Sequence, residues 1–225
     1  MPAPLSPKLH ILTAAQLALW PELKAVPSDF ILYGGTAIAL QLGHRESVDF
    51  DFFSTTPFDP DRLAALPMLA GAMPVQRDVN TLTVQIERGA PVLVSFFSIP
   101  ELGRIEPPRA VEQNGLRVAS LIDLAGMKAD VVQKRAEAKD YIDIDALIAA
   151  GLPLAQALAA ARAIQGPSFN PQITLKALSY FGDGNLAALP QDLQTRLQTA
   201  VASVDLEALP LVVANDKPFG VGAAS

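Results

Sequence analysis

The sequence of 225 residues contains no cysteine and only two histidines, His10 and His44. Without cysteine there are no disulfide bonds and no thiolate metal sites, and a cytoplasmic location is the simplest expectation. Two histidines are too few for a multi-histidine metal site. No run approaches the roughly 20 apolar residues of a membrane-spanning helix, and the N-terminal segment lacks the pattern of a signal peptide. We therefore expect neither a membrane span nor export.

Charged residues are also scarce, at 18% of the chain, and they leave a net charge of −6 at neutral pH. An acidic chain is not drawn to nucleic acid by its overall field, although a local basic groove is compatible with it. Hydrophobic residues, by contrast, make up 50% of the sequence. This is ample material for a packed core, and the length suits one large domain or two small ones.

The first half of the chain mixes helical and β patterns. A capping box at 13–16 begins a helix that runs to about Lys24, with Pro21 as its break. Alternating or continuous apolar runs separated by turn residues predict a sheet of short strands, with a hairpin connection at 87–90. We expect strands at 30–33, 48–52, 75–78, 81–87, 91–99 and 111–118, and further helices at 36–42 and 58–71.

The second half changes to helical periodicity. Proline, asparagine and glycine separate its segments, and we expect helices at 120–137, 138–150, 153–164, 171–181 and 191–204, followed by a loose tail at 215–225. The sequence therefore predicts an α+β fold, in which a small mixed sheet with flanking helices precedes an all-helical C-terminal domain. We place the domains at 1–110 and 111–225, with the joint near residues 105–120.

The most informative stretch is 30–53, FILYGGTAIALQLGHRESVDFDFF. Gly34 and Gly35 follow a strand, so the backbone can approach a ligand there without a Cβ in the way. The helix that starts at Thr36 presents the positive end of its dipole to the same place. Asp49 and Asp51 lie two residues apart on a strand, which places both carboxylates on one face.

This combination predicts a site for a metal-bound nucleoside triphosphate. The glycine turn would receive phosphate oxygens, and the two carboxylates would hold Mg²⁺ or Mn²⁺, so the reaction indicated is nucleotidyl transfer. The second half supplies candidate cations at Lys128, Lys134, Arg135 and Lys139. Asp140 and Asp143 follow them, with two interpretations each: Asp140 acts as a base or caps a helix, and Asp143 acts in the site or pairs with Lys139.

Two blocks, GGTAIALQLGHRxSxDFDFF and MKAx(5)Rx(3)KDYIDI, resemble the AbiEii/AbiGii-type toxin family of nucleotidyltransferases, within the DNA polymerase β-like superfamily. The resemblance covers roughly residues 28–55 and 118–150. It implies a mixed sheet followed by a helical domain. It also implies a role as the toxin of a bacterial toxin–antitoxin or phage-defence system, with a nucleoside triphosphate as substrate, tRNA as acceptor and a cognate antitoxin as partner.

The resemblance also implies roles for individual residues. The nucleotide-binding turn is Gly34, Gly35 and Thr36, and the metal ligands are Asp49 and Asp51. In the helical domain, Lys128 binds phosphate and Asp140 is the acid or base, and both are contributed to the cleft. Arg45 and Ser47 fall on motif positions and are assigned to nucleotide binding.

One position departs from the superfamily pattern. Many polymerase β-like enzymes carry a third carboxylate on a later strand, where this sequence has Ser95. Either the metal is held by two ligands, or Asp140 completes the site. Two alternatives to the toxin remain open: a catalytically silent module that binds nucleotide or protein, and a nucleotidyltransferase that acts on a cationic small molecule such as an aminoglycoside.

Overall fold

The structure is a computed structural model that describes residues 2–215. These form two compact units. The first contains the chain up to Leu102 together with Pro107–Ala119, and the second contains Gly103–Glu106 together with the chain from Ser120 onward. The chain therefore passes between the units at 102/103, 106/107 and 119/120, where the sequence predicts one boundary at 110/111. Residues 111–119 belong to the first unit because Val118 pairs with Leu32 in its sheet.

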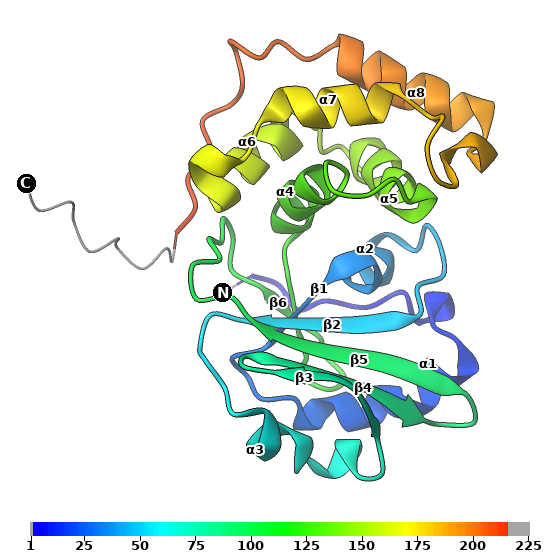
Figure 1. The fold of residues 1–225 in the computed structure, drawn as a ribbon, viewed down its shortest axis with the longest axis vertical. Helices are drawn as coiled ribbons and strands as arrows, with labels where there is room; N and C mark the ends of the chain where they lie inside the picture. Colours follow the sequence, from blue (N-terminus) through cyan, green and yellow to red (C-terminus); the bar gives the residue numbers. More distant parts are fainter. Residues whose placement is uncertain (1, 216–225) are drawn as a thin grey trace, which may run out of the picture. The chain divides into compact units, whose positions relative to one another are not determined.

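The first unit is built on a mixed sheet, as predicted, and the sheet has seven strands where the sequence indicated six (Figure 1). The strand order is β3-β4-β5-β2-β1-β7-β6, and central β2 runs parallel to β5 and antiparallel to β1. The strands are β1 Ile31–Tyr33, β2 Asp49–Ser54, β3 Met73–Asp78, β4 Thr81–Glu87, β5 Pro91–Ser98, β6 Arg109–Ala110 and β7 Arg117–Val118. The single segment expected at 111–118 is shorter, because a turn at 112–115 separates β6 from β7.

Helices cover both faces of this sheet. Helix α2, Gly34–Leu42, lies on one face, and α1, Ala14–Leu19, and α3, Pro60–Ala64, lie on the other (Figure 1). The helix expected at 58–71 is wrong in its length: α3 ends early, and a 3-10 turn, η3 Pro67–Leu69, replaces its second half. Proline at position 67 lacks the N–H that a continuing helix needs.

The strict alternation of β2 separates its two faces. Phe50 and Phe52 are fully buried, whereas Asp49 and Asp51 are half-buried on the opposite face. Phe53 follows the same alternation, so it lies on the aspartate face and not behind it. Its ring packs 5.2 Å from that of Tyr33. The α2 face of the sheet therefore carries both the predicted metal ligands and part of the apolar packing.

The second unit is helical, as predicted. Its helices are α4 Leu121–Val131, α5 Ala138–Ala149, α6 Leu154–Gln165, α7 Pro171–Ser179 and α8 Gln191–Ala202. Helix α4 is shorter than the expected 120–137 and ends in a turn before α5. It packs closely on α6, since a Cβ at Gly126 would come within 3.0 Å of the backbone of Ala160 and Ala161.

The expected tail at 215–225 lies almost wholly outside the described residues. Its first residue, Asn215, exchanges backbone hydrogen bonds with Arg104, which donates across 3.1 Å and accepts across 2.6 Å.

Within 2–215, no single helix combines the length and apolar character needed to cross a membrane. Only the bent pair Ala138–Ala149 and Leu154–Ser168, at 115°, passes that test by length and composition together.

A buried carboxylate holds the short segment Gly103–Glu106 in the second unit. Asp123 is 0% exposed and accepts from the backbone N–H of Ile105 at 2.7 Å and of Glu106 at 3.2 Å. Ser120 Oγ donates to the same carboxylate at 2.6 Å and caps α4 by accepting from its third N–H. The start of α4 and this segment are therefore fixed together.

We expect Asp123→Ala to lower the free energy of unfolding by about 3 kcal/mol, because it leaves buried donors without an acceptor. Hydrogen exchange should show lost protection at the amides of Ile105 and Glu106. Asp205→Ala, at an exposed position, is the matched control and should change little. Retained protection at both amides in Asp123→Ala would contradict this role.

Candidate nucleotide and metal site

The predicted glycine turn forms the first turn of α2 itself. Helix α2 begins at Gly34, two residues before the expected start, and Tyr33 supplies no side-chain cap. The first N–H groups of a helix have no intrahelical acceptor and carry the positive end of the dipole. The sequence thus places these donors where an anion can bind.

Gly34 lies directly against Asp51. Its φ is +72°, a left-handed conformation that side chains disfavour, and a Cβ there would come 2.7 Å from Asp51 Oδ2. The register explains this approach, because Tyr33 pairs with Asp51 across β1 and β2. The structure therefore brings the glycine turn and one predicted metal ligand together within the first unit.

The other predicted residues of this unit gather around Gly35 and Thr36. A Cβ at Gly35 would collide with Nη2 of Arg45 and would come 3.3 Å from Ser47 Oγ. Thr36 is buried and donates to the carbonyl of Asp49, and its Oγ1 lies 2.8 Å from Ser47 Oγ. Thr36 and Ser47 thus tie the start of α2 to the start of β2, whereas Arg45 brings a cation beside the glycines.

The carboxylates of Asp49 and Asp51 fit a magnesium ion that binds together with a nucleotide. Mg²⁺ is usually held by one or two carboxylates, with substrate phosphates and waters as its other ligands. Ser95 pairs with Asp51 across β2 and β5 and is 4% exposed, so the third position of the superfamily is occupied by a buried hydroxyl. No group of three or more histidine, cysteine, aspartate or glutamate side chains suited to a metal occurs within residues 2–215.

Gly34→Ala tests the close approach to Asp51. We expect it to lower the free energy of unfolding by more than the roughly 1–2 kcal/mol that a left-handed backbone alone costs. Gly71→Ala is the matched control, since Gly71 has φ +75° and nothing within 4 Å of its Cβ position. Chemical denaturation of both variants measures the difference, and equal losses would remove the argument for a crowded site.

In the second unit, Lys128 and Asp140 form one buried ion-pair cluster with two further residues. Lys128 Nζ lies 2.5 Å from Asp140 Oδ1 and 2.7 Å from Asp143 Oδ2. Arg135 donates from Nε to Asp140 Oδ2 at 2.7 Å and from Nη2 to Oδ1 at 3.1 Å. Both carboxylates are 0% exposed and Lys128 is 5% exposed. We call these four residues the lysine cluster.

The lysine cluster keeps Asp140 ionised. Burial alone would raise the pKa of the Asp140 carboxyl, but the hydrogen bond from Arg135 and the charge of Lys128 outweigh it and hold the pKa below its usual value. Asp140 is not the N-cap of α5, because it lies in the first turn after the cap position Glu137. Asp143 pairs with Lys128, and of the two interpretations the structure does not bear out the pairing with Lys139, which lies 3.0 Å from Glu137 instead.

Sequence reasoning named Arg135 only as a candidate cation and left the role of Asp143 open. Asp140 and Asp143 are three apart on α5, so they lie on one helical face. Lys128 lies on α4, and Arg135 follows in the turn between α4 and α5. The contact of α4 with α5 brings Lys128 to both carboxylates. Each unit therefore holds its own set of predicted residues in direct contact.

A mixed sheet in which a glycine-initiated helix meets a D-x-D strand, followed by a helical unit, defines a nucleotidyltransferase fold. MenT4, a nucleotidyltransferase toxin from Mycobacterium tuberculosis H37Rv, shares this fold with a TM-score of 0.56 at 14% sequence identity, over 86% of this chain and 83% of that one. The chain belongs to the AbiEii family, nucleotidyl transferase toxins of type IV toxin–antitoxin systems, whose model matches residues 22–210.

A further relative is an uncharacterized protein of Aquifex aeolicus strain VF5. It is 32% identical over 120 residues, which is 52% of this chain. The match spans 56% of the Aquifex protein, so the chain covers little more than half of that relative's length.

Proposed function

We propose that this protein transfers a nucleotide from a nucleoside triphosphate to a hydroxyl group of an acceptor. In this reaction the acceptor oxygen bonds to the α-phosphorus, pyrophosphate leaves and the hydroxyl proton passes to solvent. The approach of Gly34 to Asp51 carries the proposal, because it places the free N–H groups of a helix start against a carboxylate pair. Family membership supports the same reaction type.

Asp49 and Asp51 would hold Mg²⁺ or Mn²⁺, which on binding neutralises phosphate charge and favours attack at phosphorus. The N–H groups at Gly34, Gly35 and Thr36 receive phosphate oxygens, and the Arg45 guanidinium beside Gly35 adds a positive charge. Thr36 and Ser47 act as positioning residues, since their hydroxyl groups are used in tying α2 to β2.

The lysine cluster would serve the triphosphate from the helical unit. An ammonium group has three donors, and Lys128 directs two of them at Asp140 and Asp143, so one donor remains for a phosphate oxygen. Asp140 has both oxygens engaged by cations and a lowered pKa. We infer that it positions Lys128, which leaves the two-ligand form of the metal site as the favoured alternative.

The acceptor and partner are the finer parts of the proposal. The type IV toxin–antitoxin family to which the chain belongs supports a cognate antitoxin. On the resemblance of the two motif blocks, we also propose a setting in the bacterial cytoplasm and a role in phage defence. We propose tRNA as the acceptor, on the resemblance of the two motif blocks.

The test is a transfer assay with Mg²⁺, each labelled nucleoside triphosphate in turn and total tRNA. We expect label to move to RNA from one or more of the nucleotides. No transfer to RNA would sink the tRNA proposal.

The buried Ser95 favours a second candidate, a module that binds nucleotide without turnover. Calorimetric binding of triphosphate to a protein that transfers no label to RNA or to an aminoglycoside would establish that candidate instead.

A further inference from the structure

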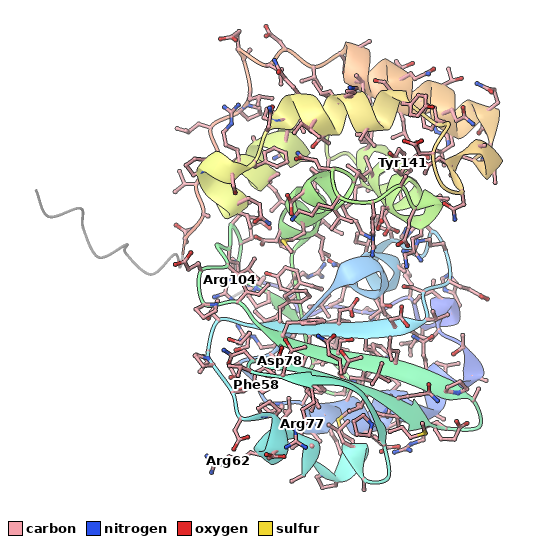
Figure 2. The ribbon with its side chains drawn as sticks, in the orientation of Figure 1. Phe58, Arg62, Arg77, Asp78, Arg104 and Tyr141 are labelled. Atoms are coloured by element: carbon pink, nitrogen blue, oxygen red, sulfur yellow. The ribbon has the colours of Figure 1, made fainter. Side chains whose placement is uncertain are left out.

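The helical unit contains a cavity of about 260 Å³ beside the lysine cluster. Its walls come from the turn between α4 and α5, the start of α5, the end of α7 and the loop that follows α7. Residues that line it include Lys134, Arg135, Tyr141, Ala177, Tyr180 and Asp183. Tyr141 lies in the first turn of α5, on the side that faces α7 (Figure 2). We call this space the tyrosine pocket.

The walls of the tyrosine pocket are fixed by hydrogen bonds and by close packing. The hydroxyl of Tyr141 donates to the carbonyl of Ala177 at 3.1 Å, and the N–H of Ala138 donates to Asn185 Oδ1 at 2.7 Å. The Tyr180 ring lies over Gly182, where a Cβ would come 2.6 Å from the ring carbon that bears the hydroxyl. Tyr180 is thus held in place although 58% of it is exposed.

The lining combines three kinds of chemistry. Lys134 and Arg135 are cations suited to phosphate, and Lys134 keeps 67% of its side chain exposed while pairing with Asp130. Tyr180 offers an aromatic face on which a base can stack. Asp183 accepts hydrogen bonds from hydroxyl or amino groups and repels a polyphosphate. A ligand with one phosphate, one base and free hydroxyl groups matches all three, and the volume lies near the lower limit for small-molecule pockets.

The net charge of the chain and the link from the tyrosine pocket to the lysine cluster favour, as the ligand, one nucleotide of an RNA acceptor strand. The chain carries −6 overall, so long-range attraction to RNA is weak and local contacts must hold it. Arg135 lines the tyrosine pocket and also donates to Asp140 of the lysine cluster. We propose that the tyrosine pocket binds one unstacked nucleotide of the RNA acceptor. The role of this pocket in the reaction rests on the proposed nucleotidyl transfer.

The test uses the full chain and a short, fluorescently labelled single-stranded RNA. Tyr180→Ala should weaken RNA binding about tenfold, the usual effect of losing one stacked base, and Tyr180→Phe should retain binding. Asp183→Ala and Lys134→Ala should each weaken it several-fold. Ile173→Ala and Lys176→Ala are the matched controls, since both residues are exposed on α7 and neither lines the pocket.

In the transfer assay, Tyr180→Ala should raise the acceptor KM about tenfold with the nucleotide KM unchanged. If Tyr180→Ala matches Ile173→Ala in RNA binding and in acceptor KM, the pocket proposal is overturned even though transfer proceeds. If the wild-type protein binds RNA through Tyr180 but transfers no nucleotide, the proposed reaction fails and the RNA site stands. Loss of binding to a co-purified protein in Tyr180→Ala, with RNA binding intact, would overturn the proposal in favour of a protein surface.

Discussion

Asp51→Asn is expected to reduce nucleotidyl transfer about a thousandfold, because a bound metal ion supplies several kcal/mol of charge stabilisation in the transition state. The substitution keeps the shape of the side chain and removes its charge. Asp51 is only half-buried, so the fold should survive. Label transfer to RNA at saturating Mg²⁺ measures the effect, and thermal unfolding checks the fold.

Asp49→Asn should behave in the same way, and chelation of the metal should abolish transfer by the wild-type protein. Asp78→Asn is the matched control: Asp78 is also a strand aspartate, at the exposed end of the edge strand β3. Activity of Asp51→Asn within about threefold of wild type would remove the metal role from this carboxylate.

Lys128→Met is expected to produce the largest loss of stability. The substitution leaves Asp140 and Asp143 buried without the ammonium that both contact. Breaking a buried ion pair by removing one partner typically costs about 3–5 kcal/mol, since an uncompensated charge remains. Chemical denaturation measures the effect, with Lys139→Met, which changes an exposed lysine of the same unit, as the control.

A double variant separates the structural role of Lys128 from its role in the reaction. Lys128→Met combined with Asp143→Leu removes one of the stranded carboxylates, so it should recover part of the stability. Transfer activity should remain lost, because no cation is restored for the triphosphate. Recovery of activity together with stability would show that Lys128 serves the fold alone.

The lysine cluster also sets a dependence on acid. The pKa of Asp140 is lower in the folded protein than in the unfolded chain, because Arg135 and Lys128 outweigh the opposing effect of burial. The cluster therefore stabilises the fold fully at pH values above the ordinary carboxyl pKa of about 4. This contribution is lost as the pH falls through the lowered pKa of Asp140 in the folded protein. In Asp140→Asn, stability should change less with pH in this acid range than in the wild-type protein.

Local sequence patterns predicted the sheet strands and the main helices well, because alternation and helical periodicity report which side of an element is buried. They failed at Pro67, which divides the helix expected at 58–71. Phe53 shows that the period outweighs residue type, because this aromatic side chain lies on the aspartate side of β2.

In the candidate site, too, sequence reasoning found the residues that are close together in the sequence and missed the contacts between distant ones. Gly34, Asp49 and Asp51 could be found because they lie within one short stretch, where spacing fixes the geometry. The partner of Asp143 could not be chosen, since its pairing with Lys128 instead of Lys139 depends on how α4 packs against α5. The tyrosine pocket was also beyond sequence reasoning, as it joins α5 and α7 with the turn before α5 and the loop after α7.

The attachment of Gly103–Glu106 to Asp123 has a genetic consequence. A fragment that starts at Ser120 would encode every helix α4–α8 yet lack the two amides that satisfy the Asp123 carboxylate. Both donors are backbone N–H groups, which any residue except proline can supply. Exchange of the helical half between family members at a single crossover would therefore keep this attachment only where the other parent's segment also brings two such N–H groups to the carboxylate.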